Sequence, residues 1–389
     1  MYHKIAYNRI HKIHSWFFIL LLTMGIIFSS CNRESGENLL NKRVVLIYLG
    51  ADNDLSLEGY DKLSALSKWK GSVNGRLLVY FDAANDVPHL IELEGNGKQK
   101  EIKSYEEQNS ASGATLNKVL SDVKAHYRAE SYGLILFSHA SGWLPKGKLS
   151  QPQSLKSDIL KTSKVDHQAT IVKDGKNEME LDDMVSGLPD KSLEFIVFEA
   201  CFMTGIEVLY ELKNKTNYIL ASSAEILSPG FTPIYEELMH CLFKDQPDLK
   251  GFGEHIFEYW NSKQGWEQSL TLSLINTRGL EPLKTFVKSR ANQANTIDLT
   301  SIQHFDRYSD YRLFFDFQDY YKQLINPMYH QELSLLIDTC VVWKAATTSF
   351  MLGFNGFEIK QHSGITTYIP QKGFEGLNNS YRKLKWNKD

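Results

Sequence analysis

The chain alternates two kinds of segment over its first half. Short, continuous apolar runs occupy residues 43–49, 76–81, 133–138, 193–198 and 217–221. Runs of this kind are typical of strands buried on both faces of a sheet, because neither side of the strand meets water. The segments between them place apolar residues at helical spacing, which predicts helices near 54–69, 114–127 and 181–188. Strands that alternate with helices indicate an α/β fold with a mostly parallel sheet flanked by helices.

Two local patterns refine this picture. Gly95-Asn-Gly97 is a strong turn signal between the short segments 89–93 and 98–103, so we expect a β-hairpin there. The helix near 54–69 should bury the apolar residues that recur at helical spacing along it. These residues are Leu57, Tyr60, Leu63 and Leu66.

The second half of the chain has weaker periodicity. Helices are expected near 246–260, 277–292 and 331–345, and strands near 270–274 and 364–369. No internal repeat and no low-complexity linker marks a domain boundary. We therefore expect a core over residues 43–230 and a mixed α/β extension over residues 231–389 that belongs to the same unit.

The first residues have the features of an export signal. Residues 1–30 contain basic residues and no acidic one, and 17–28 form a continuous apolar run. A helix that spans a bilayer needs about 20 apolar residues, so this run fits the core of a signal peptide better. Ser29-Ser-Cys31 resembles a bacterial lipoprotein box, in which the cysteine would carry the lipid. An ordinary cleaved signal and a short anchor stay open as alternatives, and the polar residues up to 42 form the expected tether.

Composition and charge narrow the function classes. The chain is 42% hydrophobic and 12% aromatic, which is ordinary for a globular protein, and its net charge is −3. A nucleic-acid-binding protein needs a basic face, so this class is not favoured. Apart from Cys31, the cysteines are Cys201, Cys241 and Cys340, an odd number, so at least one thiol is expected to be free in an oxidising compartment.

Two reactive side chains follow buried strands directly. His139 comes after the run 133–138, and Cys201 comes after the run 193–198. The carboxyl ends of parallel strands meet at one edge of a sheet, so neighbouring strands would place both residues in one cleft. A thiol and an imidazole are the groups of a cysteine peptidase. Position alone also allows Cys201 to be a small core residue and His139 a hydrogen-bonded loop residue.

A helix is expected to begin soon after the cysteine. Thr204 and Glu207 have the spacing of a capping box. A thiol near a helix N-terminus would have its thiolate form favoured by the helix dipole.

Several spaced motifs resemble the clostripain family of cysteine peptidases. They lie in the order typical of that family, and the resemblance runs from about residue 43 to the end of the chain. The motifs are Gly50-Ala-Asp-Asn-Asp-Leu55, Phe137-Ser-His-Ala-Ser-Gly-Trp143, Phe198-Glu-Ala-Cys-Phe-Met-Thr-Gly-Ile-Glu-Val208, Tyr218-Ile-Leu-Ala-Ser-Ser-Ala-Glu225 and His362-Ser-Gly-Ile-Thr-Thr-Tyr-Ile-Pro370.

The resemblance implies a caspase-like fold and assigns roles to individual residues. Cys201 would be the nucleophile and His139 the general acid/base, with the N–H groups of Ala140 and Cys201 holding the oxyanion. Glu199 would lie in the pocket that receives a basic P1 side chain, and Trp143 would shape the wall of the cleft. A carboxylate in that pocket can pair with Arg or Lys, so the implied reaction is cleavage after these residues.

Two positions depart from the family pattern. Ala140 replaces the usual glycine, which matters only if the backbone there needs a positive φ. Glu199 replaces the usual aspartate and is one methylene longer. These departures favour a second hypothesis, a non-catalytic surface lipoprotein that binds peptides or glycans on the same fold. A third, weaker hypothesis is an amidase that acts on cell-wall peptides.

The remaining motifs add options rather than requirements. The polar segment 145–167 is rich in lysine and is expected to be an exposed loop, either simply solvated or cut when a zymogen is activated. The acidic pairs Asp52 and Asp54, and Asp182 and Asp183, fit solvated faces or helix caps better than a Ca²⁺ site. No metal or other cofactor is required. The sequence thus predicts an exported, lipid-anchored cysteine endopeptidase of the cell envelope with peptide substrates.

Overall fold

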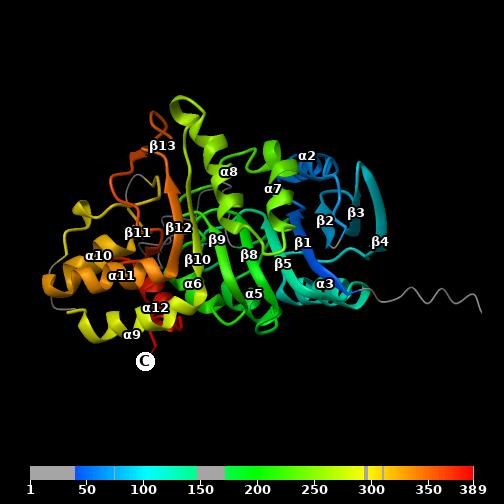
Figure 1. Cartoon of the computed structure of the whole chain (residues 1–389). Helices are drawn as coiled ribbons and strands as arrows, with labels where there is room; N and C mark the ends of the chain where they lie inside the picture. The colour runs from blue at the N-terminus through cyan, green and yellow to red at the C-terminus, as the bar shows by residue number, and fades with distance from the viewer. Residues whose placement is uncertain (1–39, 74, 147–170, 293–296, 309–310, 389) are drawn as a thin grey trace, which may run out of the picture. The chain divides into compact units, whose positions relative to one another are not determined.

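Nine strands form the central sheet of the chain. The computed structural model describes residues 40–388 apart from 74, 147–170, 293–296 and 309–310. Within this part the strand order is β12-β10-β9-β8-β5-β1-β2-β3-β4 (Figure 1). The five strands in the middle, β9, β8, β5, β1 and β2, are parallel. Their bounds are Thr216–Ala221, Leu193–Glu199, Ala129–Phe137, Asn41–Ala51 and Gly75–Ala83.

These five strands confirm the five predicted apolar runs. The residues of β1, β2 and β8 are almost all buried, and the last residues of β5 and β9 are buried too, as expected of strands covered on both faces. β1 begins at Asn41, so the last two residues of the expected tether already belong to the sheet. The predicted signal peptide and the rest of the tether, including Cys31, lie outside the described residues.

Antiparallel strands complete the sheet at both edges. The predicted hairpin is confirmed as β3 (His89–Gly95) and β4 (Lys98–Ser104), and it extends the sheet beyond β2. The turn Gly95-Asn-Gly97 has positive φ at all three residues, which glycine and asparagine adopt most readily. At the other edge β10 (Thr271–Asn276) and β12 (Val341–Ala346) pair antiparallel. The sheet is therefore parallel in its centre and mixed as a whole.

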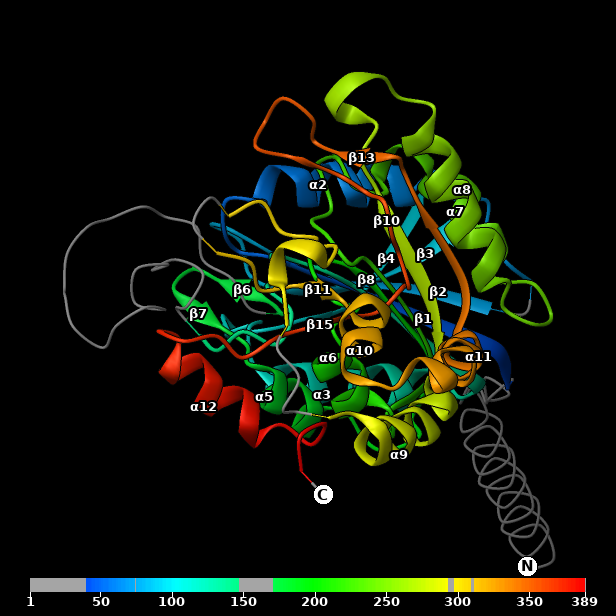
Figure 2. The ribbon, with the colours of Figure 1, turned by 90° about the vertical axis from the view of Figure 1, so that its left-hand side faces the viewer.

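Helices cover both faces of the sheet, as predicted. In Figure 2 the helices α2 (Ser56–Leu66), α7 (Tyr235–Leu242) and α8 (Leu249–Asn261) lie above the sheet. The opposite face is covered by α3 (Gly113–His126), α5 (Leu181–Gly187), α6 (Ile206–Leu212) and α9 (Leu280–Arg290). Alternate residues of β1 enter the two cores, with Val44 on one side and Val45 on the other. This alternation is the two-residue period of a strand between two helical layers.

The C-terminal half adds to the same unit. Residues 40–389 form one compact body, and β10 and β12 from this half lie in the main sheet. Further helices are α10 (Phe317–Leu324), α11 (His330–Cys340) and α12 (Glu375–Lys383). Short strand pairs join β6 (Lys173–Asp174) to β7 (Asn177–Glu178), β11 (Phe315–Asp316) to β15 (Thr366–Thr367), and β13 (Ser349–Phe350) to β14 (Phe357–Glu358). No helix in the described ranges is long and apolar enough to cross a membrane.

Three local predictions were wrong. The helix expected over 331–345 ends at Cys340, because the β-branched residues that follow enter β12. The strand expected over 364–369 is reduced to β15, Thr366–Thr367. The capping box after Cys201 does not form, because α6 begins at Ile206 without a side-chain cap. Glu207 instead accepts a hydrogen bond from the backbone N–H of Tyr368 at 2.8 Å.

The predicted buried face of α2 was right for Leu66 and wrong for Leu57 and Tyr60. Leu57 is 81% exposed and Tyr60 is 43% exposed, whereas Gly59, Lys62 and Leu66 are buried. Helical spacing alone predicted that the leucines would face the core. In the structure the buried face of α2 instead includes Lys62, whose side chain is fully buried. The partners that allow this belong to the site described next.

Candidate active site

His139 and Cys201 lie beside each other at the carboxyl edge of the sheet. β5 and β8 are parallel neighbours, and the register pairs Phe137 with Glu199. Each reactive residue follows its strand two positions after this pair. Both line one cavity of about 200 Å³. The neighbouring strands that the sequence argument required are therefore present.

Cys201 is a partly exposed thiol in a turn, not at a helix end. The Ile226 N–H donates to its Sγ at 3.4 Å. Burial, together with the nearby Glu225 carboxylate, raises the pKa of Cys201 to about 12. α6 begins only at Ile206, so the expected stabilisation of the thiolate by a helix N-terminus is absent from this geometry. In the conformation described, the thiol is protonated at neutral pH.

His139 faces an acidic side chain from the turn between β1 and α2. Its Nε2 lies 3.1 Å from Asp54 Oδ1, and its side chain is 31% exposed. Burial alone would raise the pKa of Asp54, but the adjacent His139 lowers it overall. Within the described residues no hydrogen bond joins His139 to Cys201. The two groups share a cavity while the imidazole is held by Asp54.

The alanine beside the histidine fits its position. Ala140 is buried and its φ is not positive, so the side chain that replaces the usual glycine hydrogen causes no backbone strain. Neither the N–H of Ala140 nor that of Cys201 donates a hydrogen bond to a residue that the structure describes. Both amides are therefore available to an oxyanion.

The two loops that carry the reactive residues touch through backbone atoms. Gly142 has φ +61°, and a Cβ at this position would lie 2.6 Å from the carbonyl oxygen of Phe202. Phe202 follows the nucleophile with φ +62°, an unusual value for a bulky residue. Its ring stacks on Phe314 with the centroids 4.3 Å apart. Packing thus holds a strained backbone next to Cys201.

Glu199 lies at the floor of the cavity, and its carboxylate already has a cationic partner. Lys62 Nζ lies 2.6 Å from Glu199 Oε1, and both side chains are fully buried. The Phe231 N–H donates to the same oxygen at 2.5 Å, and the Tyr235 hydroxyl donates to the other. Burial raises the pKa of Glu199, and the Lys62 ammonium opposes that change. The carboxylate lies where the sequence placed it but has an internal partner.

Trp143 is not brought to this cavity. It is buried and packs against Tyr368 and Tyr381, with ring centroids 5.1 and 5.5 Å away. It lines a different cavity, next to Leu144 and Pro145. The tryptophan that was expected to form the wall of the cleft serves instead to pack the loop after β5 against the C-terminal helix α12.

The other motif residues support the site from behind. Glu225, whose charge acts on Cys201, forms a two-pronged ion pair with Arg307, at 2.6 and 3.1 Å. His362 Nε2 lies 3.2 Å from Ser223 Oγ in a partly buried setting. Residues of these two motifs therefore bond to one another behind the cavity, whereas Trp143 lines a different one.

Sequence reasoning missed two members of the site, Glu58 and Lys62 on α2. Glu58 lines the same cavity as Cys201, and its Oε1 lies 3.1 Å from Lys62 Nζ. Glutamate and lysine four residues apart are common on exposed helix surfaces, so the pattern looks unremarkable. The only available signal was a lysine among the apolar positions of an amphipathic helix.

The acidic side chains of the described residues were also considered as ligands for a metal ion. In the described ranges no set of three or more His, Cys, Asp or Glu side chains is arranged to hold a metal ion. Of the acidic pairs, Asp54 contacts His139, and Asp183 accepts the Gly113 N–H at 2.8 Å.

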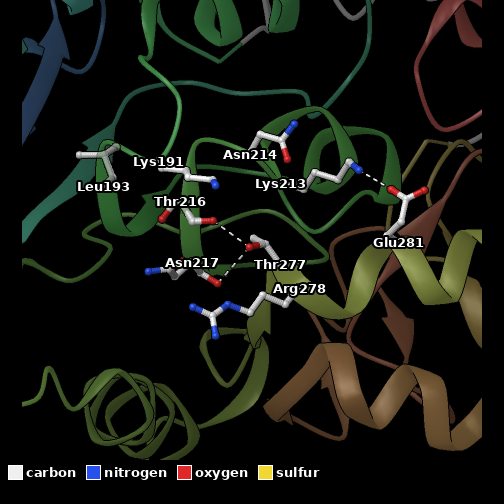
Figure 3. A pocket seen from close by; sticks show the side chains of 9 residues that line it. All are labelled: Lys191, Leu193, Lys213, Asn214, Thr216, Asn217, Thr277, Arg278 and Glu281. Atoms are coloured by element: carbon white, nitrogen blue, oxygen red, sulfur yellow. Dashed lines mark hydrogen bonds and ion pairs between the residues drawn. The ribbon is translucent and has the colours of Figure 1, made fainter.

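A second, larger cavity lies at the opposite edge of the sheet. It has a volume of about 500 Å³ and includes the starts of β8 and β9, at Leu193 and Thr216 (Figure 3). Thr277 donates to the Thr216 carbonyl at 2.8 Å, and Lys213 pairs with Glu281. Neither cysteine nor histidine lines it, so it offers no comparable chemistry.

Comparisons with known proteins found a matching family model and several similar structures. A family model described as the clostripain family, Peptidase C11, matches residues 47–351. The chain is similar to the structure of an inactive zymogen of a C11 protease from Parabacteroides distasonis, at 29% identity and a TM-score of 0.77. That match covers 90% of this chain and 98% of the other. No curated protein matches the chain.

Two structures from Bacteroides thetaiotaomicron extend the comparison. A secreted C11 cysteine protease in complex with an irreversible peptide inhibitor is 25% identical with a TM-score of 0.74, covering 90% of this chain and 98% of its own. A structure of a secreted C11 cysteine protease called iotapain is 21% identical with a TM-score of 0.75, covering 90% and 99%, and shows the same fold.

Proposed function

The chain belongs to the clostripain family of cysteine peptidases, and from that premise we propose that it is an exported endopeptidase with Cys201 as nucleophile and His139 as general acid/base. The observation that carries the proposal is the position of both residues in one cavity at the carboxyl edge of the sheet. The two available amides of Ala140 and Cys201 add the third requirement, an oxyanion site.

The reaction follows from these groups. His139 accepts the proton of the Cys201 thiol, and the thiolate attacks the carbonyl carbon of the scissile bond. The N–H groups of Ala140 and Cys201 hold the oxyanion, and His139 returns the proton to the leaving amine. Water then attacks the thioester carbonyl carbon while His139 takes its proton. The C–S bond breaks, the new carboxyl end is released, and His139 returns the proton to the Cys201 sulfur.

The conformation described fits a resting state of such an enzyme. His139 faces Asp54, and Cys201 has a raised pKa, so the dyad needs a change in the orientation of His139 before it reacts. A similar chain from Parabacteroides distasonis is described as an inactive zymogen. We propose that a cut in the lysine-rich segment 145–167, most of which lies outside the described residues, releases the active arrangement.

The proposed substrates are peptides with Arg or Lys at P1. The cavity that holds Cys201 is also lined by the carboxylates of Glu58 and Glu199. An electronegative pocket beside the nucleophile favours a cationic side chain. The proposed location is the cell envelope, with the lipid on Cys31. A similar protease is described as secreted, which agrees with export.

A non-catalytic lipoprotein that binds peptides remains the second candidate. The observation in its favour is the protonated Cys201 with His139 held on Asp54. If that arrangement persisted after processing, the fold would offer a peptide-sized cleft without a thiolate.

Hydrolysis of fluorogenic peptides tests the proposal. Residues 32–389 would be assayed on peptides with Arg, Lys, Ala or Asp at P1, before and after limited trypsin treatment and trypsin inhibition, with Cys201→Ala alongside. We expect cleavage after Arg and Lys that the substitution abolishes. Cleavage only after Ala or Asp would keep the dyad and remove the basic preference. No cleavage of any peptide under either condition would favour the binding protein.

A further inference from the structure

We propose that Glu58, and not Glu199, is the carboxylate that contacts a basic P1 side chain, because Lys62 neutralises Glu199 from within the protein. The inference rests on the proposed peptidase function and names the specificity residue of the same cavity. It follows from the contacts of three charged side chains, Glu58, Lys62 and Glu199, called here the charge triad.

Glu199 lines the cavity, but its carboxylate oxygens are occupied by partners from within the protein. Its side chain has no exposed surface, and neither does that of Lys62. Gly230 lies against it with φ +60°, and a Cβ there would lie 2.1 Å from Glu199 Oε1. The donors from Lys62, Phe231 and Tyr235 occupy both carboxylate oxygens. A substrate cation would have to displace a buried ion pair to reach this group, which is costly.

Lys62 is fixed in place by more than one acceptor. Its Nζ lies 2.9 Å from Thr232 Oγ1 and 3.2 Å from the Pro229 carbonyl oxygen. The ring of Phe137 lies under the ammonium group, with its centroid 4.2 Å away. A lysine with this many partners, fully removed from water, stays in its position when a ligand enters the cavity.

Glu58 is the member of the triad that a ligand can reach. Its side chain is 15% exposed and lines the cavity that contains Cys201. Oε1 lies 3.1 Å from Lys62 Nζ, and Oε2 accepts a hydrogen bond from the Ser228 hydroxyl at 2.8 Å. These contacts orient the carboxylate at the wall of the cavity and leave part of it open to an incoming donor.

The charges of the triad do not balance without a ligand. Two carboxylates share one ammonium, which leaves one net negative charge at the cavity. The other charged groups near Cys201 have partners of their own, Asp54 with His139 and Lys173, and Glu225 with Arg307. A single cationic P1 side chain that contacts Glu58 would therefore neutralise the pocket.

Acid-to-amide variants of the full-length chain test this assignment. The measured quantity is the ratio of kcat/KM for an Arg-P1 peptide to that for the matched Leu-P1 peptide. We expect Glu58→Gln to lower this ratio about tenfold or more. Asp61→Asn, which removes a negative charge from an exposed position of the same helix, should leave the ratio unchanged.

A double variant separates the two glutamates. Lys62→Met with Glu199→Gln removes the buried pair and keeps the net charge of the cavity, so the ratio should stay within about threefold of the parent. If the double variant loses the preference for Arg over Leu while Glu58→Gln keeps it, Glu199 is the residue that contacts the P1 side chain and the proposal is overturned. Melting temperatures identify any variant that fails to fold. Glu58→Asp keeps the negative charge, so it should retain more of the preference for Arg than Glu58→Gln does.

A binding measurement keeps the proposal testable if no peptide is cleaved. Agmatine carries the guanidinium group of an arginine side chain, and its binding to the Cys201→Ala chain can be followed by calorimetry. We expect binding that weakens about tenfold with Glu58→Gln. Absence of cleavage with Glu58-dependent binding would contradict only the peptidase. Binding that Glu58→Gln does not alter would contradict the assignment of Glu58.

Discussion

Cys201 and Asp82 both have a pKa well above the value usual for their side chains, and each raised pKa leads to a prediction. Cys201 is a thiol with a pKa of about 12, beside an imidazole that faces elsewhere. Asp82 is fully buried at the end of β2, and burial raises its pKa to about 7. Neither property is visible in the sequence, because both depend on what surrounds the side chain.

The raised pKa of Cys201 predicts a pH profile for its reaction with iodoacetamide. The thiolate is the reacting form, so the rate in the resting chain should rise with pH and show no plateau up to about pH 10. Trypsin-treated protein should instead plateau at lower pH, if the dyad forms. The Cys201→Ser chain measures the background from other thiols, and a plateau near pH 8.5 in the resting chain would contradict the described environment.

Asp82 predicts a pH dependence of stability. Its folded pKa of about 7 lies above the ordinary value, so its ionisation destabilises the fold increasingly between about pH 4 and pH 7. Asp82→Asn removes that ionisation. The free energy of unfolding of this variant, relative to the parent, should therefore rise by roughly 2–4 kcal/mol from pH 4 to pH 8 in urea titrations. The exposed change Asp61→Asn is the control, and parallel curves for Asp82→Asn and the parent would refute the prediction.

At the scale of single elements, the central strands were predictable and the face of α2 was not. The strand runs are continuous, β-branched and apolar, so their burial follows from composition alone. Lys62 inverts the rule that charged residues face water, because its ammonium group lies between Glu58 of the same helix and Glu199 from the end of β8. The residues of the site divide in the same way. His139 and Cys201 were predicted because they follow buried strands. Glu58 and Lys62 were missed because the sequence of α2 is typical of a helix on the surface.

The loop contact at Gly142 predicts a local effect on activity. Gly142→Ala places a Cβ 2.6 Å from the Phe202 carbonyl in a backbone with φ +61°. It should cost about 1–3 kcal/mol of stability and lower kcat, because both catalytic loops must move apart. Gly97→Ala is the matched control, with φ +79° and no atom near its Cβ, so it tests backbone strain alone. Equal effects of both substitutions on kcat would contradict the role of the contact.

At the scale of the molecule, the C-terminal half completes the catalytic unit. β10 and β12 extend the central sheet. The Tyr368 N–H donates to Glu207, which lies in α6 six residues after Cys201. The extension was predicted as part of the same unit, but its strand at 341–346 was missed because it follows α11 without a break. Because no turn residue separates α11 from β12, the hydrophobic pattern does not show where the helix ends and the strand begins.

The burial of Trp386 indicates that the folded unit extends past residue 351, where the match to the family model ends. Trp386 is 1% exposed and packs against Tyr210 and Phe317, with ring centroids 5.6 and 5.8 Å away. Trp386→Ala should lower the free energy of unfolding by about 3–5 kcal/mol in urea titrations. Trp266→Ala, at a 42% exposed position, should cost far less. Similar costs for both would show that the C-terminal segment does not share the core.

The direction of β1 determines how an anchored molecule would present its cleft. β1 is parallel to β5 and β8, so it enters the sheet at Asn41 on the edge opposite the one that carries His139 and Cys201. Its eleven residues place these two edges roughly 35 Å apart. If a lipid is attached upstream of Asn41, its pull would thus reach the body at the side of the sheet that does not carry His139 and Cys201.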